Sequence, residues 1–410
     1  MRFGRFLRSR KVTLEEMLGA VAAETGAKVS GRKVLVIQDT SELNFTGHML
    51  SKQGFGSVGR GKDIGFYIHP QLVVDAVTSG VIGLAGASVI NRTGEKATDR
   101  RKREPQKKES RRWLQGAQTA GAVLDRAEEI TVVADRESDI YDEFARRPAH
   151  VHLLTRVAQD RLLIGGGRLF DFAQKLPNLF QDEIEVAAKG TRPGRKAKVS
   201  GGFGRVEIAR PANGVLDATL AASVSLSIID VREINPPAGE TPVRWLLATT
   251  HRVENVEDAR RMVQWYRRRW LIEQFFRTLK SQCLRLEESQ IIAVEPLMKL
   301  TVAAMIAAAR VLQLVQARDG TTHQILADAF DAADEPLIEA LVAKLEGKTQ
   351  KQKNPHPKGG LARAAWVIGR LGGWSGYSGG GYKPAGPKTI YDGLVQYDAI
   401  RRGWRIGKEV

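Results

Sequence analysis

Residues 130–144 read ITVVADRESDIYDEF, and this stretch decides the fold class that we expect. An apolar, β-branched run ends at Asp135, and polar residues that can begin a helix follow directly. Residues 33–45, KVLVIQDTSELNF, repeat this arrangement with Asp39 after the apolar run. Short runs rich in Val and Ile and bounded by polar turns are typical of strands buried on both faces. Each stretch therefore predicts a buried strand that ends at an aspartate.

The segments around these two strands alternate between strand-like and helix-like patterns. We expect strands where β-branched runs end at turn residues, and helices where apolar residues recur every three or four positions. This order of elements predicts an α/β fold with a mixed sheet and helices on its faces. The expected elements are helices over 12–28 and 113–124 and further strands over 64–75, 81–92 and 150–157.

The composition limits the partners and the chemistry of this chain. Its 410 residues include 63 Lys and Arg against 46 Asp and Glu, a formal charge of +17, which favours a polyanionic partner. Cys283 is the only cysteine, so a disulfide framework and a multi-thiolate metal site are excluded. No apolar run of signal length follows the basic N-terminus. The most apolar later stretch, 301–315, is too short to cross a bilayer, so we expect no membrane partner.

Composition and pattern change several times along the second half of the chain. Residues 158–250 contain short alternating runs among Gly and Pro turns, which predict an inserted, mostly antiparallel β-region. The basic segment 92–112 is expected to be a solvated loop or a ligand-facing arm. Towards the end of the chain we expect a long helix over 253–283, further helices across 293–345, a flexible link over 348–360 and a last helix near 361–371. We expect the whole chain to divide into five parts. The parts are 1–30, a helical remnant; 31–157, the first part of the core; 158–250, the insertion; 251–292, the rest of the core; and 293–410, a helical region.

The strongest chemical signal lies in the expected long helix. It carries Tyr266, Arg269, Glu273 and Lys280. At about 100° per residue these positions share an arc of about 60°, so one helix face presents a carboxylate, two cations and a phenol. On an arbitrary basic helix, a solvated face with an Arg–Glu ion pair is the more frequent explanation of such a pattern.

The two strand-end aspartates favour the functional interpretation of that face. Open α/β sheets place their sites at the carboxyl ends of strands, although each aspartate alone is more often a turn or cap residue. Asp39, Asp135 and Glu273 together supply the carboxylate oxygens that two Mg²⁺ ions require, with Mn²⁺ as a substitute. Two such ions activate a water or a 3′-hydroxyl for in-line displacement at phosphorus. The cations near Glu273 would hold neighbouring phosphates.

Four stretches together resemble the bacterial DDE transposases. They look most like the insertion-sequence branch that carries a Tyr-x2-Arg-x3-Glu-x6-Lys box, the branch of the transposase from the kanamycin-resistance composite transposon. The similarity continues to residues 368–374 and so covers almost the whole chain. The stretches are QDTSELNF (38–45), VVADRESDIYDEF (132–144), INPPAGETPVRWLLATT (234–250) and YRRRWLIEQFFRTLK (266–280).

The resemblance implies a fold and a role for each of the candidate residues. The fold would be a ribonuclease-H-like mixed sheet with helices on both faces, interrupted by the β-insertion and followed by the C-terminal helical region. Asp39, Asp135 and Glu273 would be the catalytic metal ligands. Tyr266, Arg269 and Lys280 would hold DNA phosphates, and Trp245 and Trp270 would stack on a base flipped out of the helix, although core packing is the alternative for both tryptophans.

The resemblance also implies partners and leaves three functions open. The partners would be double-stranded DNA, as transposon ends and target, and a second copy of the chain bound through residues 293–410, in the bacterial cytoplasm at the nucleoid. The first function is cut-and-paste transposition by nicking, hairpin formation and resolution, and strand transfer. Because family members begin with an end-recognition domain that is mostly missing here, a truncated, non-catalytic inhibitor or a decayed remnant is the second. A ribonuclease-H-like nuclease with another substrate is the third.

Overall fold

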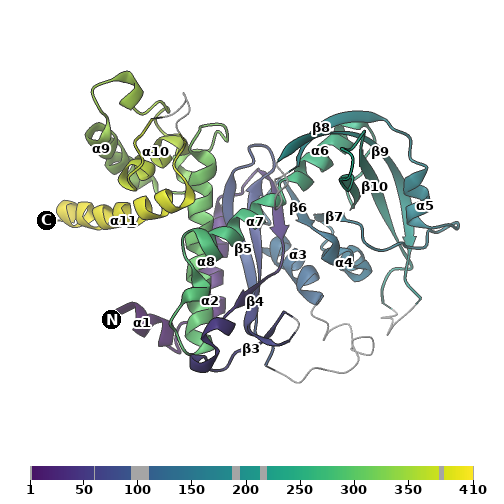
Figure 1. Ribbon diagram of the computed structural model, residues 1–410, viewed down its shortest axis with the longest axis horizontal. Coiled ribbons are helices and arrows are strands. Elements are labelled where there is room, and N and C mark those ends of the chain that lie inside the picture. The colour runs from purple at the N-terminus through teal and green to yellow at the C-terminus, as the bar shows by residue number, and fades with distance from the viewer. Residues whose placement is uncertain are drawn as a thin grey trace. The chain divides into compact units, whose positions relative to one another are not determined.

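The computed structural model describes residues 2–59, 61–93, 110–186, 194–212, 219–377 and 383–409 (Figure 1). The chain divides into two compact units. The first comprises Met1–Glu95, Val123–Glu128 and Trp270–Val410, and the second comprises Lys96–Ala122 and Glu129–Arg269. Residues 94–109, most of the basic segment expected to form a loop or arm, lie outside the described residues.

The sheet of the first unit is built around the long strand β4 (Asp63–Asp75). β4 pairs antiparallel with four other strands, and Gln38 at the end of β1 lies opposite Gln71. The expected strands over 33–39, 64–75 and 81–92 are confirmed, and two short strands join them. The partners of β4 are β1 (Lys33–Gln38), β2 (Ser41–Asn44), β3 (Gly56–Val58) and β5 (Val81–Ile90).

Two helices of the first unit pack against β5, namely α2 (Leu14–Ala27) and α8 (Val294–Ala317). α2 begins where the sequence predicts, because Thr13 and Glu16 form a capping box. The hydroxyl of Thr25 accepts a hydrogen bond from the backbone N–H of Leu84 in β5 at 3.1 Å. The remaining helices of this unit are α1 (Arg2–Arg8), α7 (Trp270–Arg277), α9 (Glu335–Leu345), α10 (Leu361–Leu371) and α11 (Pro387–Glu409).

α8 corrects the expectation that the apolar stretch near residue 301 is too short for a membrane. The helix has 24 residues and is long and apolar enough to cross one. However, 61% of its most apolar window is buried inside the fold. Val302, Met305 and Leu314 on this helix are fully buried, as in the core helix of a globular unit.

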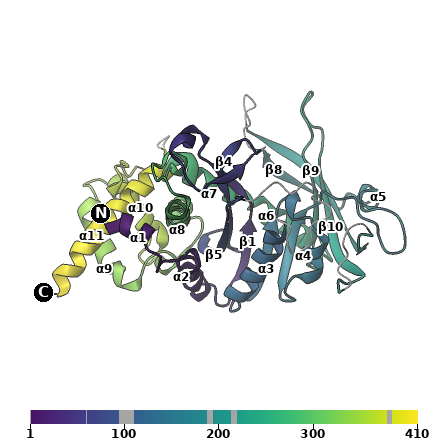
Figure 2. The same cartoon turned by 90° about the horizontal axis from the view of Figure 1, so that it is seen from below.

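The C-terminal helices form a cluster with its own apolar core. α9, α10 and α11 gather around the end of α8 in both views (Figures 1 and 2). Trp366 of α10 and Tyr397 of α11 are buried in this core. The helix expected near 361–371 is confirmed as α10, but it is not the last one, because the 23-residue helix α11 follows the Gly/Pro-rich tail.

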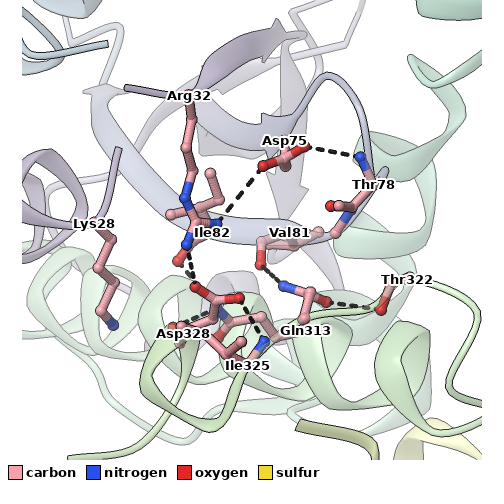
Figure 3. A network of polar contacts seen from close by, with 12 residues as sticks. Lys28, Arg32, Asp75, Thr78, Val81, Ile82, Gln313, Thr322, Ile325 and Asp328 are labelled. Carbon is pink, nitrogen blue, oxygen red and sulfur yellow. Dashed lines mark hydrogen bonds and ion pairs between the residues drawn. The ribbon is translucent and has the colours of Figure 1, made fainter. Parts of the chain in front are cut away.

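A buried polar network ties this helical region to the sheet of the first unit (Figure 3). Arg32, just before β1, donates to Asp328 at 2.8 Å and lies 3.6 Å from Asp75. Gln313 of α8 donates to the backbone carbonyls of Ile82 and Asp328, at 3.1 and 2.9 Å. These contacts satisfy polar groups that the packing of helix on sheet would otherwise leave without partners.

The described residues of the second unit form six strands of mixed direction. β6 and β7 are parallel, and the other neighbouring strands are antiparallel, in the order β6-β7-β11-β10-β9-β8. The expected antiparallel character of residues 158–250 is therefore confirmed. The strands are β6 (Glu129–Ala134), β7 (Val151–Arg156), β8 (Phe180–Val186), β9 (Arg195–Ala209), β10 (Ser223–Glu233) and β11 (Arg244–Thr249). The helices are α3 (Arg111–Val123), α4 (Tyr141–Arg146), α5 (Leu169–Gln174) and α6 (Val256–Arg267).

The long helix expected over residues 253–283 is interrupted. α6 ends at Arg267 and α7 begins at Trp270. The backbone N–H groups of Arg268 and Arg269 bond to carbonyls three residues earlier, which tightens the end of α6. After α7, a π-helical turn covers Thr278–Gln282. The four residues assigned to one helix face therefore lie on different backbone segments, and the expectation of a single continuous helix beneath them was wrong.

Candidate active site

Asp135 lies directly after β6, at the carboxyl end of a buried strand. Its backbone carbonyl accepts from the Ser138 backbone N–H at 3.0 Å and from the Thr155 hydroxyl of β7 at 3.1 Å. The Asp135 side chain is 35% exposed. The two parallel strands thus fix the backbone at Asp135 and leave its carboxylate accessible to solvent.

Tyr266 and Arg269 both approach the Asp135 carboxylate. The buried Tyr266 hydroxyl donates to Asp135 Oδ1 at 3.1 Å, and Arg269 Nη2 lies 4.0 Å from Oδ2. Burial, with the negative charge of Asp135 as a further cause, raises the pKa of Tyr266 to about 12. The phenol therefore stays protonated near neutral pH and remains a donor to the carboxylate.

Trp245 completes this group of side chains in the second unit. It lies on β11, and its ring meets the Tyr266 ring edge to face at a centroid distance of 5.5 Å. Trp245 is half-buried, so it is not enclosed in the core. The structure thus brings together four of the eight predicted site residues in one place: Asp135, Trp245, Tyr266 and Arg269.

Asp39 follows β1 in the first unit, as the sequence predicts. It is half-buried, and its Oδ1 accepts from the Thr40 backbone N–H at 2.7 Å. His69 on β4 is fully buried and contacts both neighbours of Asp39 through its ring nitrogens. Nδ1 lies 2.9 Å from the Thr40 hydroxyl, and Nε2 lies 3.0 Å from Gln38 Oε1.

The other predicted residues of the first unit follow the break after α6. Trp270, the first residue of α7, is 47% exposed, and Glu273 in its first turn is half-buried. Lys280 lies in the π-helical turn, where its Nζ is 3.7 Å from Glu287 Oε1. An indole is a side chain on which bases can stack, and a carboxylate in the first turn of a helix interacts favourably with the helix dipole.

The donor chemistry of the three predicted metal ligands fits a hard divalent cation. Asp39, Asp135 and Glu273 offer carboxylate oxygens, which Mg²⁺ prefers and which Mn²⁺ also accepts. Asp39 and Glu273 belong to the first unit, and Asp135 belongs to the second. Among the described residues, no group of three or more His, Cys, Asp or Glu side chains could hold a metal ion. The fit therefore rests on the chemistry of the donors.

Three residues near the aspartates were not singled out from the sequence. His69 bridges the residues on either side of Asp39. Arg156 lies at the end of β7, and its positive charge partly offsets the rise in the pKa of Tyr266. Asp139, four residues after Asp135, is buried and accepts from Arg161 and from the backbone N–H groups of residues 158 and 159. Of the three, only Asp139 could have been found from the sequence, through its Asp-x3-Asp spacing from Asp135. The positions of His69 and Arg156 beside the aspartates depend on strand pairing.

A comparison with known protein families identifies one family model that covers much of this chain. A family model described as "Transposase DDE domain" matches residues 92–309, more than half of the chain. The match includes Asp135, Trp245 and the whole segment from Tyr266 to Lys280, and it begins after Asp39.

Proposed function

Because this chain belongs to the family of transposases with a DDE domain, we propose that it catalyses cut-and-paste DNA transposition. DNA is the substrate that the family implies, and its members generally use divalent metal ions. The contact that supports the proposal best is the Tyr266–Asp135 hydrogen bond, with Arg269 beside it. It joins a strand-end aspartate to two residues of the Tyr-Arg-Glu-Lys box.

In this proposal Asp39, Asp135 and Glu273 would hold two Mg²⁺ ions, with Mn²⁺ as a substitute. Such ions activate a water or a 3′-hydroxyl and stabilise the leaving oxygen at phosphorus. The reaction would proceed by nicking of the transposon end, hairpin formation and resolution, and strand transfer to target DNA. The core that performs it would be ribonuclease-H-like.

The remaining residues act on the DNA and on the carboxylates. Arg269 and Lys280 supply positive charge to phosphates next to the scissile one. Tyr266 donates to Asp135 and so orients that carboxylate, a role beside the phosphate contact that the resemblance implies. Trp245 and Trp270 stack on an extruded base, an interaction worth about 1–3 kcal/mol per base.

We place the reaction in a homodimer that joins two transposon ends, in the bacterial cytoplasm at the nucleoid. The C-terminal region from residue 293 is the proposed dimer surface. Val395, Ile400 and Trp404 on α11 are partly exposed apolar side chains. Exposed apolar side chains are typical of protein–protein contacts where they form a contiguous patch.

Cleavage of a duplex that carries the terminal sequences flanking the gene tests this proposal. Asp39→Ala, Asp135→Ala and Glu273→Ala should each lower Mg²⁺-dependent cleavage by more than about 100-fold, the upper range for losing a group that merely orients a metal ligand. DNA binding should change little, because phosphate contacts dominate the affinity.

Asp142→Ala is the matched control. Asp142 lies on α4 in the same unit as Asp135 and pairs with Arg146 in a partly exposed i,i+4 ion pair. Its loss should leave cleavage unchanged. Substantial cleavage by any of the three triad variants would refute the assignment of that residue.

A further inference from the structure

Lys280 is held by a carboxylate on the segment that follows it. Its Nζ lies 3.7 Å from Oε1 of Glu287, in the 3₁₀ turn Leu286–Glu288. The Lys280 side chain is 27% exposed and that of Glu287 is 31% exposed. Solvent, and therefore an anionic ligand, can reach both charged groups.

Glu287 itself is firmly placed. Its Oε1 also accepts the backbone N–H of Asn44, the last residue of β2, at 2.9 Å. Nearby, Lys52 Nζ donates to the carbonyls of Ser289 and Ile291 at 2.6 and 2.7 Å. The segment that carries Glu287 is thereby tied to β2 and to the turn after it. A fixed acceptor thus faces the ammonium group of a flexible side chain.

From these contacts, and resting on the proposed function, we propose that Glu287 is a counter-ion that competes with DNA phosphate for Lys280. It holds the ammonium group in place until a DNA phosphate replaces the carboxylate. Because a partly exposed ion pair contributes little free energy, phosphate can displace Glu287 readily.

Glu287→Gln separates the charge of this residue from its structural contact. The amide oxygen can still accept from the Asn44 N–H, but the negative charge that competes with phosphate is gone. We expect the dissociation constant and the KM for the terminal-sequence duplex to fall about two- to fivefold. The kcat at saturating DNA should stay unchanged, because phosphate has then replaced the carboxylate. A merely structural role would not produce tighter binding.

Glu288→Gln is the matched control. Glu288 is the next residue, lies in the same turn and pairs with Arg285 at 2.7 Å, with both side chains mostly exposed. The variant makes the same change in net charge beside a different cation. Its dissociation constant should therefore fall less than that of Glu287→Gln. Equal affinities of the two variants would overturn the inference, because net charge alone would then explain the gain.

A double-mutant cycle with Lys280→Met isolates the pair. In that background Glu287→Gln should lower the dissociation constant no more than Glu288→Gln does, since there is no ammonium group left to release. A full effect without Lys280 would contradict the assigned partner. If the wild-type chain neither binds nor cleaves the duplex, the proposed function fails and the inference fails with it. If the wild type does both while the two variants behave alike, only the role of Glu287 is refuted.

Discussion

The phenol of Tyr266 offers the most direct test of how Asp135 is held. Tyr266→Phe removes only the hydroxyl that donates to Asp135 Oδ1. We expect the cleavage rate to fall about tenfold or more, the range for losing a group that orients a metal ligand. The free energy of unfolding should fall by about 1 kcal/mol, as for an ordinary hydrogen bond.

Tyr141→Phe provides the control for that substitution. Tyr141 lies on α4 in the same unit, is buried, and donates through its hydroxyl to the carbonyl of Ala221 at 2.8 Å. Removing this hydroxyl should lower the free energy of unfolding by a similar amount and leave the cleavage rate at the wild-type value. Equal cleavage rates for the two variants would show that the Tyr266 hydroxyl does not orient Asp135.

His251 should make the second unit sensitive to acid. It is buried after β11, stacks on His152 at 3.8 Å and pairs with the Thr131 hydroxyl at 2.8 Å. Burial, with the repulsion of His152 and Arg261, lowers the pKa of His251 to about 3. As the pH falls below about 6.5, the unfolded chain binds a proton at His251 that the folded chain does not.

The stability that the neutral His251 contributes is therefore present above pH 6.5 and is lost as the pH falls toward 3. Between pH 6.5 and 5 the expected loss is about 2 kcal/mol from this residue. Urea unfolding of the wild type and of His251→Gln across this range measures it. The variant should show a flatter dependence on pH, and equal slopes would contradict the assignment.

At the level of structural elements, the polar network around Arg32 stabilises the contact between the C-terminal helices and the sheet of the first unit. The Asp328 side chain is 3% exposed and accepts from Arg32, which is 27% exposed. Removing one partner of a buried pair costs about 3–5 kcal/mol, and the partial exposure of Arg32 lowers the expectation for Asp328→Ala to about 2 kcal/mol. Chemical denaturation measures the change.

Glu128→Gln serves as the control for Asp328→Ala. Glu128 pairs with Lys33 of β1 at 3.3 Å, but both side chains are largely exposed. Such surface pairs are worth about 0–1 kcal/mol. If Asp328→Ala were as stable as Glu128→Gln, the network would not stabilise the contact between helices and sheet.

For the whole molecule, the formal charge of +17 predicts that DNA binding depends strongly on salt. A protein with six or more phosphate contacts loses about 10³-fold or more in affinity between 50 and 200 mM salt. Arg269→Ala and Lys280→Ala should each lower the slope of log Kd against log salt by about one, because each removes one phosphate contact. Titration of a labelled duplex at several salt concentrations gives the slope. An unchanged slope would show that the residue makes no phosphate contact.

The sequence by itself predicted most of the local structure. The strands that end before Asp39 and Asp135, the capped helix after Thr13 and the antiparallel strands within residues 158–250 are all present. These features depend on neighbouring residues, because apolar periodicity and capping act over a few positions. The helix break at Arg268 and Arg269 escaped prediction, since no Pro or Gly marks it. The helix α11 was missed because the Gly/Pro-rich tail suggested an end to regular structure.

The contacts between distant residues were decided only by the tertiary structure. Tyr266 meets Asp135 across 131 positions of the chain, and His69 reaches both neighbours of Asp39 from another strand. Glu287 faces Lys280 because a backbone N–H of β2 fixes its carboxylate. The chain pattern predicts which residues end a strand, but strand pairing and register determine which side chains meet there. The sequence therefore determined the chemistry of the candidate residues, and the folding of distant segments against one another decided which of them act together.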